Sequence, residues 1–196
     1  MKITAKAVRR GAAVLVLAAV ILAAAYRASY PIKLNIATLP EEIAAFLGHG
    51  SSAWDASTIK IYDGAEIGNR MYFLMEVGPE LEFGRVILER GPVGGYRIDR
   101  LGYGGGNFLD GIVESGGKRY LLFGGRDIAA RITRIEVTIE GRAYELENPA
   151  PRDHFLLCAE IDGRVEDSHV DRDKVRFYSA DGEDITGLYD LSGGGI

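Results

Sequence analysis

The sequence has very little cysteine. Cys158 is the single thiol among 196 residues, so no disulfide can form within the chain and the fold must be held by its core alone. This cysteine lies in an apolar run, His154-Phe-Leu-Leu-Cys-Ala159. Because a small thiol in such a run is typically buried, we expect Cys158 to be a core residue. The alternative is that it pairs between chains outside the cell.

Acidic side chains are missing from the first forty residues. The only charges there are basic and belong to Lys2, Lys6, Arg9, Arg10, Arg27 and Lys33. The other 17 of the 23 basic residues stand against all 28 acidic ones, so the rest of the chain has a net charge of -11. Nucleic acids and anionic membrane surfaces bind clustered Lys and Arg, so we expect this acidic body to bind neither.

Known catalytic and ligand-binding motifs are also missing. His49, His154 and His169 are the only histidines, and no two have the spacing of zinc ligands. The run Leu101–Phe108 is rich in glycine, but it lacks the glycine offset and the following helix of a dinucleotide-binding motif, so we predict a loop there. There is no serine nucleophile elbow. The sequence thus indicates no catalytic, cofactor-binding or metal-binding residue.

Acidic residues cluster between positions 160 and 173. Calcium prefers many oxygen ligands, which such a segment could provide. However, the segment lacks the turn glycine and terminal glutamate of an EF-hand at the required positions, and basic residues within it supply counter-charge. We interpret it as a solvated loop, with cation binding as the alternative.

The first forty residues, which contain no acidic side chain, include a long apolar segment. Residues 11–26 carry no charge and follow Arg9-Arg10, which is the layout of a secretory signal or of an uncleaved membrane anchor. Sixteen helical residues span about 24 Å, somewhat less than a hydrocarbon core of about 30 Å. We expect a single-pass transmembrane helix over residues 11–30, flanked by interfacial Tyr26 and Tyr30. Secretion after cleavage near Tyr26 is the alternative, since three alanines precede it.

The basic residues before this segment predict its orientation. By the positive-inside rule, residues 1–10 lie in the cytoplasm and everything after Tyr30 lies outside. Residues 31–37 read as a short stalk. The extracytoplasmic domain would then occupy residues 38–196.

A short helix is expected at the start of this domain. Thr38 and Glu41 have the spacing of a capping box, apolar residues from Leu39 to Leu47 share one face, and Gly48 marks the exit. We therefore predict one short amphipathic helix that packs on a sheet.

After residue 50 the pattern changes to short β-prone runs separated by glycine, which is typical of antiparallel strands. Gly116-Gly117 and Glu140-Gly141 are predicted hairpin turns, and Ile135, Val137 and Ile139 alternate with polar residues. The fold class is therefore mainly β: an antiparallel, sandwich-like domain preceded by a transmembrane helix. The best internal break is residues 149–151, and a second small lobe from about residue 131 is the alternative.

Four aromatic residues are candidates for a recognition surface. They are Trp54, Tyr62, Tyr72 and Tyr103. Amphipathic aromatic side chains often anchor interfaces, although such residues also occur in half-buried cores.

The order of basic start, apolar segment, stalk, helix and glycine-punctuated strands gives the chain its layout. Together with the late segments Ile132-Thr-Arg-Ile-Glu-Val-Thr-Ile and Val175-Arg-Phe-Tyr-Ser-Ala-Asp-Gly-Glu-Asp-Ile-Thr, this layout resembles small uncharacterised membrane-anchored extracytoplasmic proteins of Gram-positive bacteria. The resemblance covers the layout of the whole chain. It implies a place in the cell envelope and gives no catalytic residue to carry over.

These observations predict a membrane-anchored, non-catalytic binding or regulatory module of the cell envelope, with an envelope protein or a small molecule as its partner. The first alternative is a secreted hydrolase whose carboxylate pair is assembled only by the fold. A second alternative is a structural protein that presents a sheet edge to a partner strand.

Overall fold

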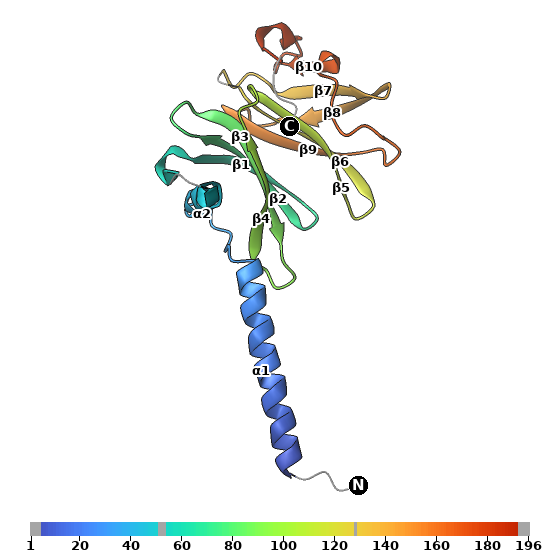
Figure 1. Cartoon of the computed structure of the whole chain (residues 1–196). Helices are drawn as coiled ribbons and strands as arrows, with labels where there is room; N and C mark the ends of the chain where they lie inside the picture. The colour runs from blue at the N-terminus through green and yellow to red at the C-terminus, as the bar shows by residue number, and fades with distance from the viewer. Residues whose placement is uncertain (1–4, 51–53, 128, 192–196) are drawn as a thin grey trace.

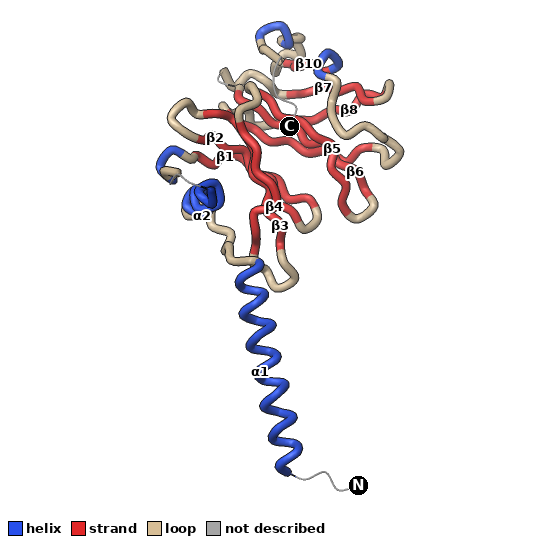
Figure 2. Tube along the Cα trace, viewed as in Figure 1, coloured by secondary structure: helices blue, strands red, loops and turns tan. Residues whose placement is uncertain are grey.

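The structure is a computed structural model that describes residues 5–50, 54–127 and 129–191, and the side chains of residues 5–10 and 50 are not described. Two α-helices and three antiparallel sheets make up this part of the chain (Figure 2). The predicted fold class is confirmed: the domain is mainly β with antiparallel sheets, and an apolar helix precedes it. Short 3₁₀ helices lie at Gly48–Gly50, Ala56–Thr58, Arg172–Lys174 and Thr186–Leu188.

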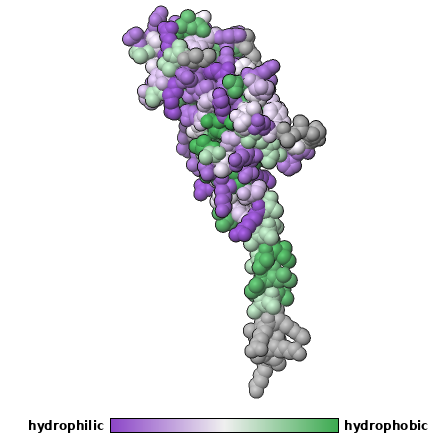
Figure 3. Space-filling view, turned by 90° about the vertical axis from the view of Figure 1, so that its left-hand side faces the viewer, coloured by the Kyte–Doolittle hydropathy of each residue, from purple (hydrophilic) through white to green (hydrophobic). Residues whose placement is uncertain are grey.

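Helix α1 (Ala5–Ser29) projects away from the body (Figure 1). Its segment Gly11–Ser29 is long and apolar enough to cross a membrane, and none of it is buried in the body, although a secretory signal would have the same properties. Nineteen helical residues span about 28 Å. Figure 3 shows this apolar segment in green beneath a largely hydrophilic body. The helix ends at Ser29 because Pro31 disfavours helical geometry at Tyr30.

The segment after α1 is bound to the body. Ile32 forms an isolated antiparallel bridge with Tyr96: the Ile32 N–H donates to the Tyr96 carbonyl at 3.0 Å, and the Tyr96 N–H donates back at 2.8 Å. The Ile32 side chain is buried. This bridge fixes the end of α1 close to the first sheet.

Helix α2 (Leu39–Leu47) buries Leu39, Ile43 and Ala44, as its apolar face predicted. The predicted capping box does not form. Thr38 has helical backbone angles (φ -105°, ψ -5°) and caps nothing with its side chain, whereas a side-chain N-cap requires extended geometry. Its hydroxyl instead donates to the Asn35 carbonyl at 3.4 Å. At the other end, His49 Nδ1 lies 2.7 Å from the Ala45 carbonyl oxygen, so this side chain lies at the C-terminal end of the helix.

The first sheet has the simple order β1-β2-β3-β4. Its strands are β1 (Lys60–Ile67), β2 (Arg70–Val77), β3 (Glu82–Arg90) and β4 (Tyr96–Tyr103). One face packs under α2 through residues such as Met75 and Leu88. The opposite face presents Tyr72, Leu74 and Ile87 to the second sheet.

The remaining strands form two three-stranded sheets. The second sheet has the order β5-β6-β9, with β5 (Phe108–Ser115), β6 (Lys118–Arg126) and β9 (His154–Ile161). The third has the order β10-β7-β8, with β7 (Arg134–Ile139), β8 (Arg142–Glu147) and β10 (Val175–Tyr178). Both predicted hairpin turns are confirmed, since all four residues of Gly116-Gly117 and Glu140-Gly141 have positive φ.

The sheets are stacked as layers, in the order α2, first sheet, second sheet, third sheet (Figure 1). The phenylalanines Phe108, Phe123, Phe155 and Phe177 fill the core between the second and third sheets. A smaller apolar cluster lies between the first and second sheets, so this interface is only partly filled with apolar side chains. Charged side chains occupy the rest of it, as described below.

The prediction that Cys158 is buried is wrong, because the residue is exposed. It lies on β9, at the edge of the second sheet. Leu156, on the same face of the strand, packs against the first sheet, but this packing does not extend to Cys158. An apolar run at a sheet edge can therefore expose one of its members.

Candidate functional site

A basic cleft lies between the first and second sheets. Strands β2, β3 and β4 form one wall, and β5 together with Ser168 and His169 forms the other. We call it the inter-sheet cleft; its volume is about 260 Å³. Its charged lining consists of Arg70, Arg85, Arg100 and Asp99. Three arginines thus face a single carboxylate in a small space.

The strand register explains why these arginines converge. Tyr72 of β2 pairs with Ile87 of β3, and Ile87 pairs with Arg100 of β4, so all three lie in one row across the sheet. Because side chains alternate along a strand, Arg70 shares a face with Tyr72, and Arg85 shares a face with Ile87. This is the face that meets the second sheet.

A bulge in β4 supplies the one carboxylate of the cleft. The register between β3 and β4 shifts at Ile87 and Leu88, which leaves Asp99 without a partner in the ladder. Its Oδ2 lies 3.3 Å from Arg70 Nη2. Asp99 therefore compensates the charge of Arg70. The charges of Arg85 and Arg100 are not compensated by a carboxylate of the cleft.

Arg85 crosses the cleft without meeting a carboxylate. Its guanidinium lies against Gly111 of β5, where a Cβ atom would be only 3.2 Å from Arg85 Nη1. It makes no hydrogen bond or ion pair with the residues that the structure describes, and the same holds for Arg100. Burial lowers the pKa of the Arg85 guanidinium; the nearby Tyr72 and Asp110 oppose this effect, and the charge of Arg100 adds to it. A cation held in this way is an incomplete ion pair.

The nearest buried carboxylate, Asp110, is already engaged. Its Oδ1 accepts a hydrogen bond from Arg172 Nη2 at 3.0 Å, and its Oδ2 accepts one from the Val170 N–H at 2.9 Å. The Ile112 N–H also donates to the Ser168 carbonyl at 3.1 Å. These bonds hold the loop that carries Ser168 and His169 against β5, and they leave Arg85 without a direct partner.

The cleft offers further hydrogen-bond donors beside its cations. Burial raises the pKa of the Tyr72 hydroxyl, so it stays a neutral donor at pH 7. Ser168 and His169 line the opposite wall. Guanidinium groups bind planar or tetrahedral oxyanions through paired N–H donors. The chemistry of the cleft therefore suits a small anion.

A second charged cluster joins the same two sheets at the ends of β2 and β6. Glu76 accepts hydrogen bonds from the Tyr62 hydroxyl at 2.6 Å, from Arg126, and from His154 Nε2 at 3.2 Å. The Tyr62 and His154 rings stack with their centroids 3.6 Å apart. Burial alone would raise the pKa of Glu76, but the bonds from Tyr62 and His154 and the charge of Arg126 bring it below its ordinary value. Glu76 is thus an ionised structural anchor.

A third buried carboxylate follows the end of β6, beside the segment that leads into β7. Asp127 accepts hydrogen bonds from the Tyr189 hydroxyl and from the Ile132 N–H, each at 2.8 Å. Among the described residues, the buried carboxylates Glu76, Asp110 and Asp127 thus have separate sets of donors.

The four aromatic residues proposed for a recognition surface lie in three places. Trp54 and Tyr103 pack edge to face on the α2 side of the first sheet, with ring centroids 5.8 Å apart. Tyr62 belongs to the Glu76 cluster, and Tyr72 lines the inter-sheet cleft. The structure therefore joins only Trp54 with Tyr103.

The acidic segment 160–173 is compensated largely by neighbouring cations. Asp162 pairs with Arg142 and Arg164, and Asp171 pairs with Lys174 at 3.1 Å. Within the described ranges, no group of three or more His, Cys, Asp or Glu side chains could hold a metal ion.

Sequence reasoning missed the arginines of the cleft. One signal was available: Arg85 interrupts the run Phe83–Leu88, which is otherwise buried. A charge at an inward position of a buried strand indicates a partner or a site. Its convergence with Arg70 and Arg100, however, depends on strand order and register.

Comparison of the chain with protein-family models, with curated proteins and with solved structures finds no match.

Proposed function

We propose that this protein is a membrane-anchored, extracytoplasmic binding module of the cell envelope whose inter-sheet cleft binds a small anion with a phosphate or carboxylate group. The observation that carries the proposal is Arg85, a half-buried guanidinium that spans the cleft and has no hydrogen-bond or ion-pair partner among the described residues. A bound oxyanion would complete this ion pair. The volume of about 260 Å³ suits a small metabolite.

The anchor is supported by the way α1 joins the domain. The apolar helix continues to Ser29, past the alanines that could be cleaved before Tyr26. The Tyr26 hydroxyl accepts hydrogen bonds from the Val93 and Gly95 N–H groups, so Tyr26 contributes to the folded domain. The basic residues Lys2, Lys6, Arg9 and Arg10 precede the apolar run, and this favours a cytoplasmic N-terminus.

The geometry favours binding over hydrolysis. A hydrolase of the expected kind needs two close carboxylates, one of them with a raised pKa. Glu76 has a lowered pKa and three donors, and Asp110 and Asp127 are bound elsewhere. The inter-sheet cleft has one carboxylate, which pairs with Arg70.

The cleft is tested by anion titration of the full-length protein in detergent. We expect inorganic phosphate or citrate to raise the Tm of the wild type in a concentration-dependent way, because a ligand that binds only the folded state stabilises it. Arg85→Gln should remove this shift. Arg90→Gln is the matched control, since Arg90 ends the same strand outside the cleft and pairs only with exposed Glu66 at 3.8 Å. An unchanged shift in Arg85→Gln, or no shift in the wild type, would overturn the proposed site.

The anchor is tested separately by fractionation of cells and by the mass of the mature protein. An intact N-terminus in the membrane fraction after alkaline extraction is expected. A new terminus near Tyr26 in the medium would show that the protein is secreted.

A further inference from the structure

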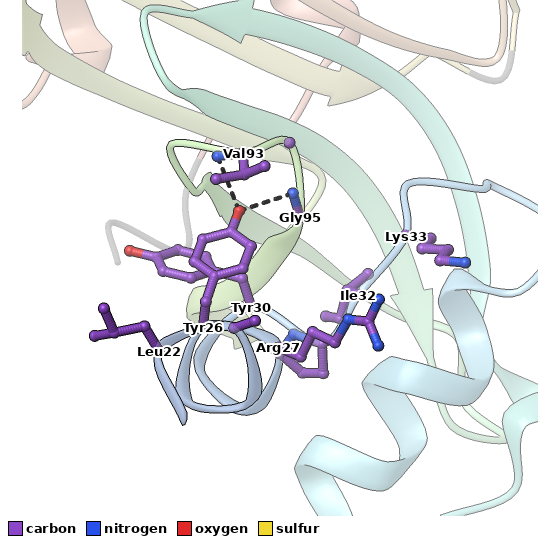
Figure 4. A pocket seen from close by; sticks show the side chains of 11 residues that line it. Leu22, Tyr26, Arg27, Tyr30, Ile32, Lys33, Val93 and Gly95 are labelled. Atoms are coloured by element: carbon purple, nitrogen blue, oxygen red, sulfur yellow. Dashed lines mark hydrogen bonds between the residues drawn. The ribbon is translucent and has the colours of Figure 1, made fainter. Parts of the chain in front are cut away.

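A second hollow lies where α1 meets the loop between β3 and β4. We call it the juxtamembrane groove; its volume is about 980 Å³ (Figure 4). Leu22 and Tyr26 line it from α1, Val93 lines it from the loop, and Lys33 lines it from the segment after the helix. It therefore combines the last turns of the apolar helix with the nearest part of the domain.

The junction beside the groove is tightly packed. The Tyr26 hydroxyl accepts hydrogen bonds from the Val93 N–H at 3.0 Å and from the Gly95 N–H at 3.2 Å, as Figure 4 shows. The Tyr26 and Tyr30 rings stack with centroids 5.3 Å apart. A Cβ atom at Gly91 would lie 2.8 Å from the Tyr30 ring, so only glycine fits there. These contacts hold the loop at a fixed level relative to the helix.

This level coincides with the edge of the apolar segment. The uncharged run of α1 ends at Tyr26, so Leu22 lies one helical turn inside it and Arg27 lies just beyond it. Val93, at the neighbouring loop, has an exposed fraction of 79%. If α1 crosses a membrane, Leu22 faces hydrocarbon, Val93 lies in the interface, and Arg27 lies among headgroups.

Two cations of the groove are uncompensated. The side chains of Arg27 and Lys33 make no hydrogen bond or ion pair with any described residue, and no acidic side chain lines the groove. Figure 4 shows both side chains on the side of Ile32, away from Val93. Arg97, by contrast, contacts the Tyr30 ring but is paired with Glu89 at 2.5 Å. The groove thus has an apolar floor and a rim with two free positive charges.

We propose that the juxtamembrane groove binds an anionic phospholipid of the outer leaflet, with its phosphate at Arg27 and Lys33 and an acyl chain along Leu22. The inference rests on the proposed membrane anchor and is independent of the inter-sheet cleft. A phospholipid fits because the floor is apolar at the level of the hydrocarbon while the cations lie at the level of headgroup phosphates. The rest of the domain is acidic and would not attract such a lipid.

The proposal is tested with full-length protein in vesicles of equimolar phosphatidylcholine and phosphatidylglycerol. The protein is extracted in mild detergent, and native mass spectrometry measures the lipids that remain bound. We expect several-fold enrichment of phosphatidylglycerol over phosphatidylcholine in the wild type. The double variant Arg27→Gln, Lys33→Gln should lose this enrichment.

The matched control is Lys60→Gln, Arg152→Gln, which removes two positive charges from the end of the domain opposite the helix. Lys60 stands opposite Glu76 in the β1–β2 backbone ladder, at the end of the first sheet away from Tyr96, and Arg152 lies beside Asp63 of β1. This control should retain the enrichment of the wild type. Equal loss in both double variants would mean that overall charge, not the groove, selects the lipid, and would overturn the proposal.

A second measurement tests how deeply the loop between β3 and β4 lies in the membrane interface. Tryptophan placed by Val93→Trp should be quenched by brominated lipids, whereas Trp54, on the α2 side of the domain, should not. Absence of quenching at residue 93 would overturn the proposal.

Membrane fractionation distinguishes failure of the groove proposal from failure of the proposed membrane anchor. If the wild type is recovered in membranes but shows no lipid enrichment, the groove proposal fails and the anchor stands. If the wild type is not recovered in membranes, the proposed anchor fails and the groove proposal fails with it.

Discussion

Two charged side chains at the interface of the first two sheets, Glu76 and Arg85, differ in whether they have partners. Glu76 has three donors from β1, β6 and β9, and it links both sheets. Arg85 has none, although it is half-buried in the same interface. Paired charges of this kind fix the arrangement of the layers, and an unpaired one marks where a ligand would bind.

Glu76 gives a prediction for stability against pH. The pKa of Glu76 is lower in the folded protein than in the unfolded chain. The ionised side chain therefore contributes to the free energy of unfolding in full above the unfolded-state pKa of about 4.3, and this contribution is lost as the pH falls through the folded-state pKa. Glu76→Gln should destabilise the protein by about 1–3 kcal/mol at pH 7. The difference in free energy of unfolding between wild type and variant should shrink below pH 4.

Chemical denaturation at several pH values measures this difference. Glu66→Gln is a suitable control, because Glu66 is an exposed residue of β1 whose nearest cation is 3.8 Å away. A Glu76→Gln difference that stays constant from pH 7 to pH 3 would contradict the assigned role.

At the scale of elements, the junction between α1 and the β3–β4 loop depends on glycine. A Cβ atom at Gly95 would lie 2.6 Å from the Tyr30 carbonyl oxygen, and the main chain cannot yield as a flexible side chain would. We expect Gly95→Ala to destabilise the domain by about 1–3 kcal/mol, as overpacking does. Gly163→Ala should have little effect, because nothing lies within 4 Å of its Cβ position.

The effect is measured by thermal unfolding together with hydrogen exchange of the Val93 and Gly95 amides, which donate to Tyr26. Faster exchange at both amides is expected in Gly95→Ala. Unchanged exchange and an unchanged Tm would show that the junction tolerates a side chain there.

The strands themselves could largely be predicted from the sequence. In β7, Ile135, Val137 and Ile139 are buried as their alternation predicted. Strand β1 is harder to predict over its full length, because it continues through Asp63-Gly64-Ala65-Glu66, which has low β propensity. Pairing with β2 stabilises this extension, and Gly64 leaves room for the Phe73 ring, since a Cβ there would lie 2.5 Å from it.

The candidate site could not be predicted, because it depends on features that appear only in three dimensions. Arg70, Arg85 and Arg100 are fifteen residues apart along the chain and become neighbours through the order of β2, β3 and β4. The bulge that places Asp99 beside Arg70 has no sequence signature. A sequence alone also does not reveal that Asp110 is bound by Arg172 and therefore unavailable to Arg85.

At the scale of the whole molecule, the layers differ in how they are held together. The second and third sheets share a large aromatic core, whereas the first and second sheets share a smaller apolar cluster beside two groups of charged residues, the Glu76 cluster and the inter-sheet cleft. An interface with fewer apolar contacts opens at lower free energy. The cleft thus lies in the interface whose stability a ligand can change most.

Anion binding should therefore change protection from hydrogen exchange at the interface of the first and second sheets, and not at the interface of the second and third sheets. With saturating phosphate, we expect slower hydrogen exchange at the Val170 and Ile112 amides, which hold the 168–170 loop on β5, and in the strands that carry the three arginines. Exchange in β7 and β8, on the far side of the aromatic core, should not change. Arg85→Gln should show no phosphate effect in either region. Protection that rises equally in all three sheets would instead indicate general stabilisation by salt, and it would argue against a site between the first two sheets.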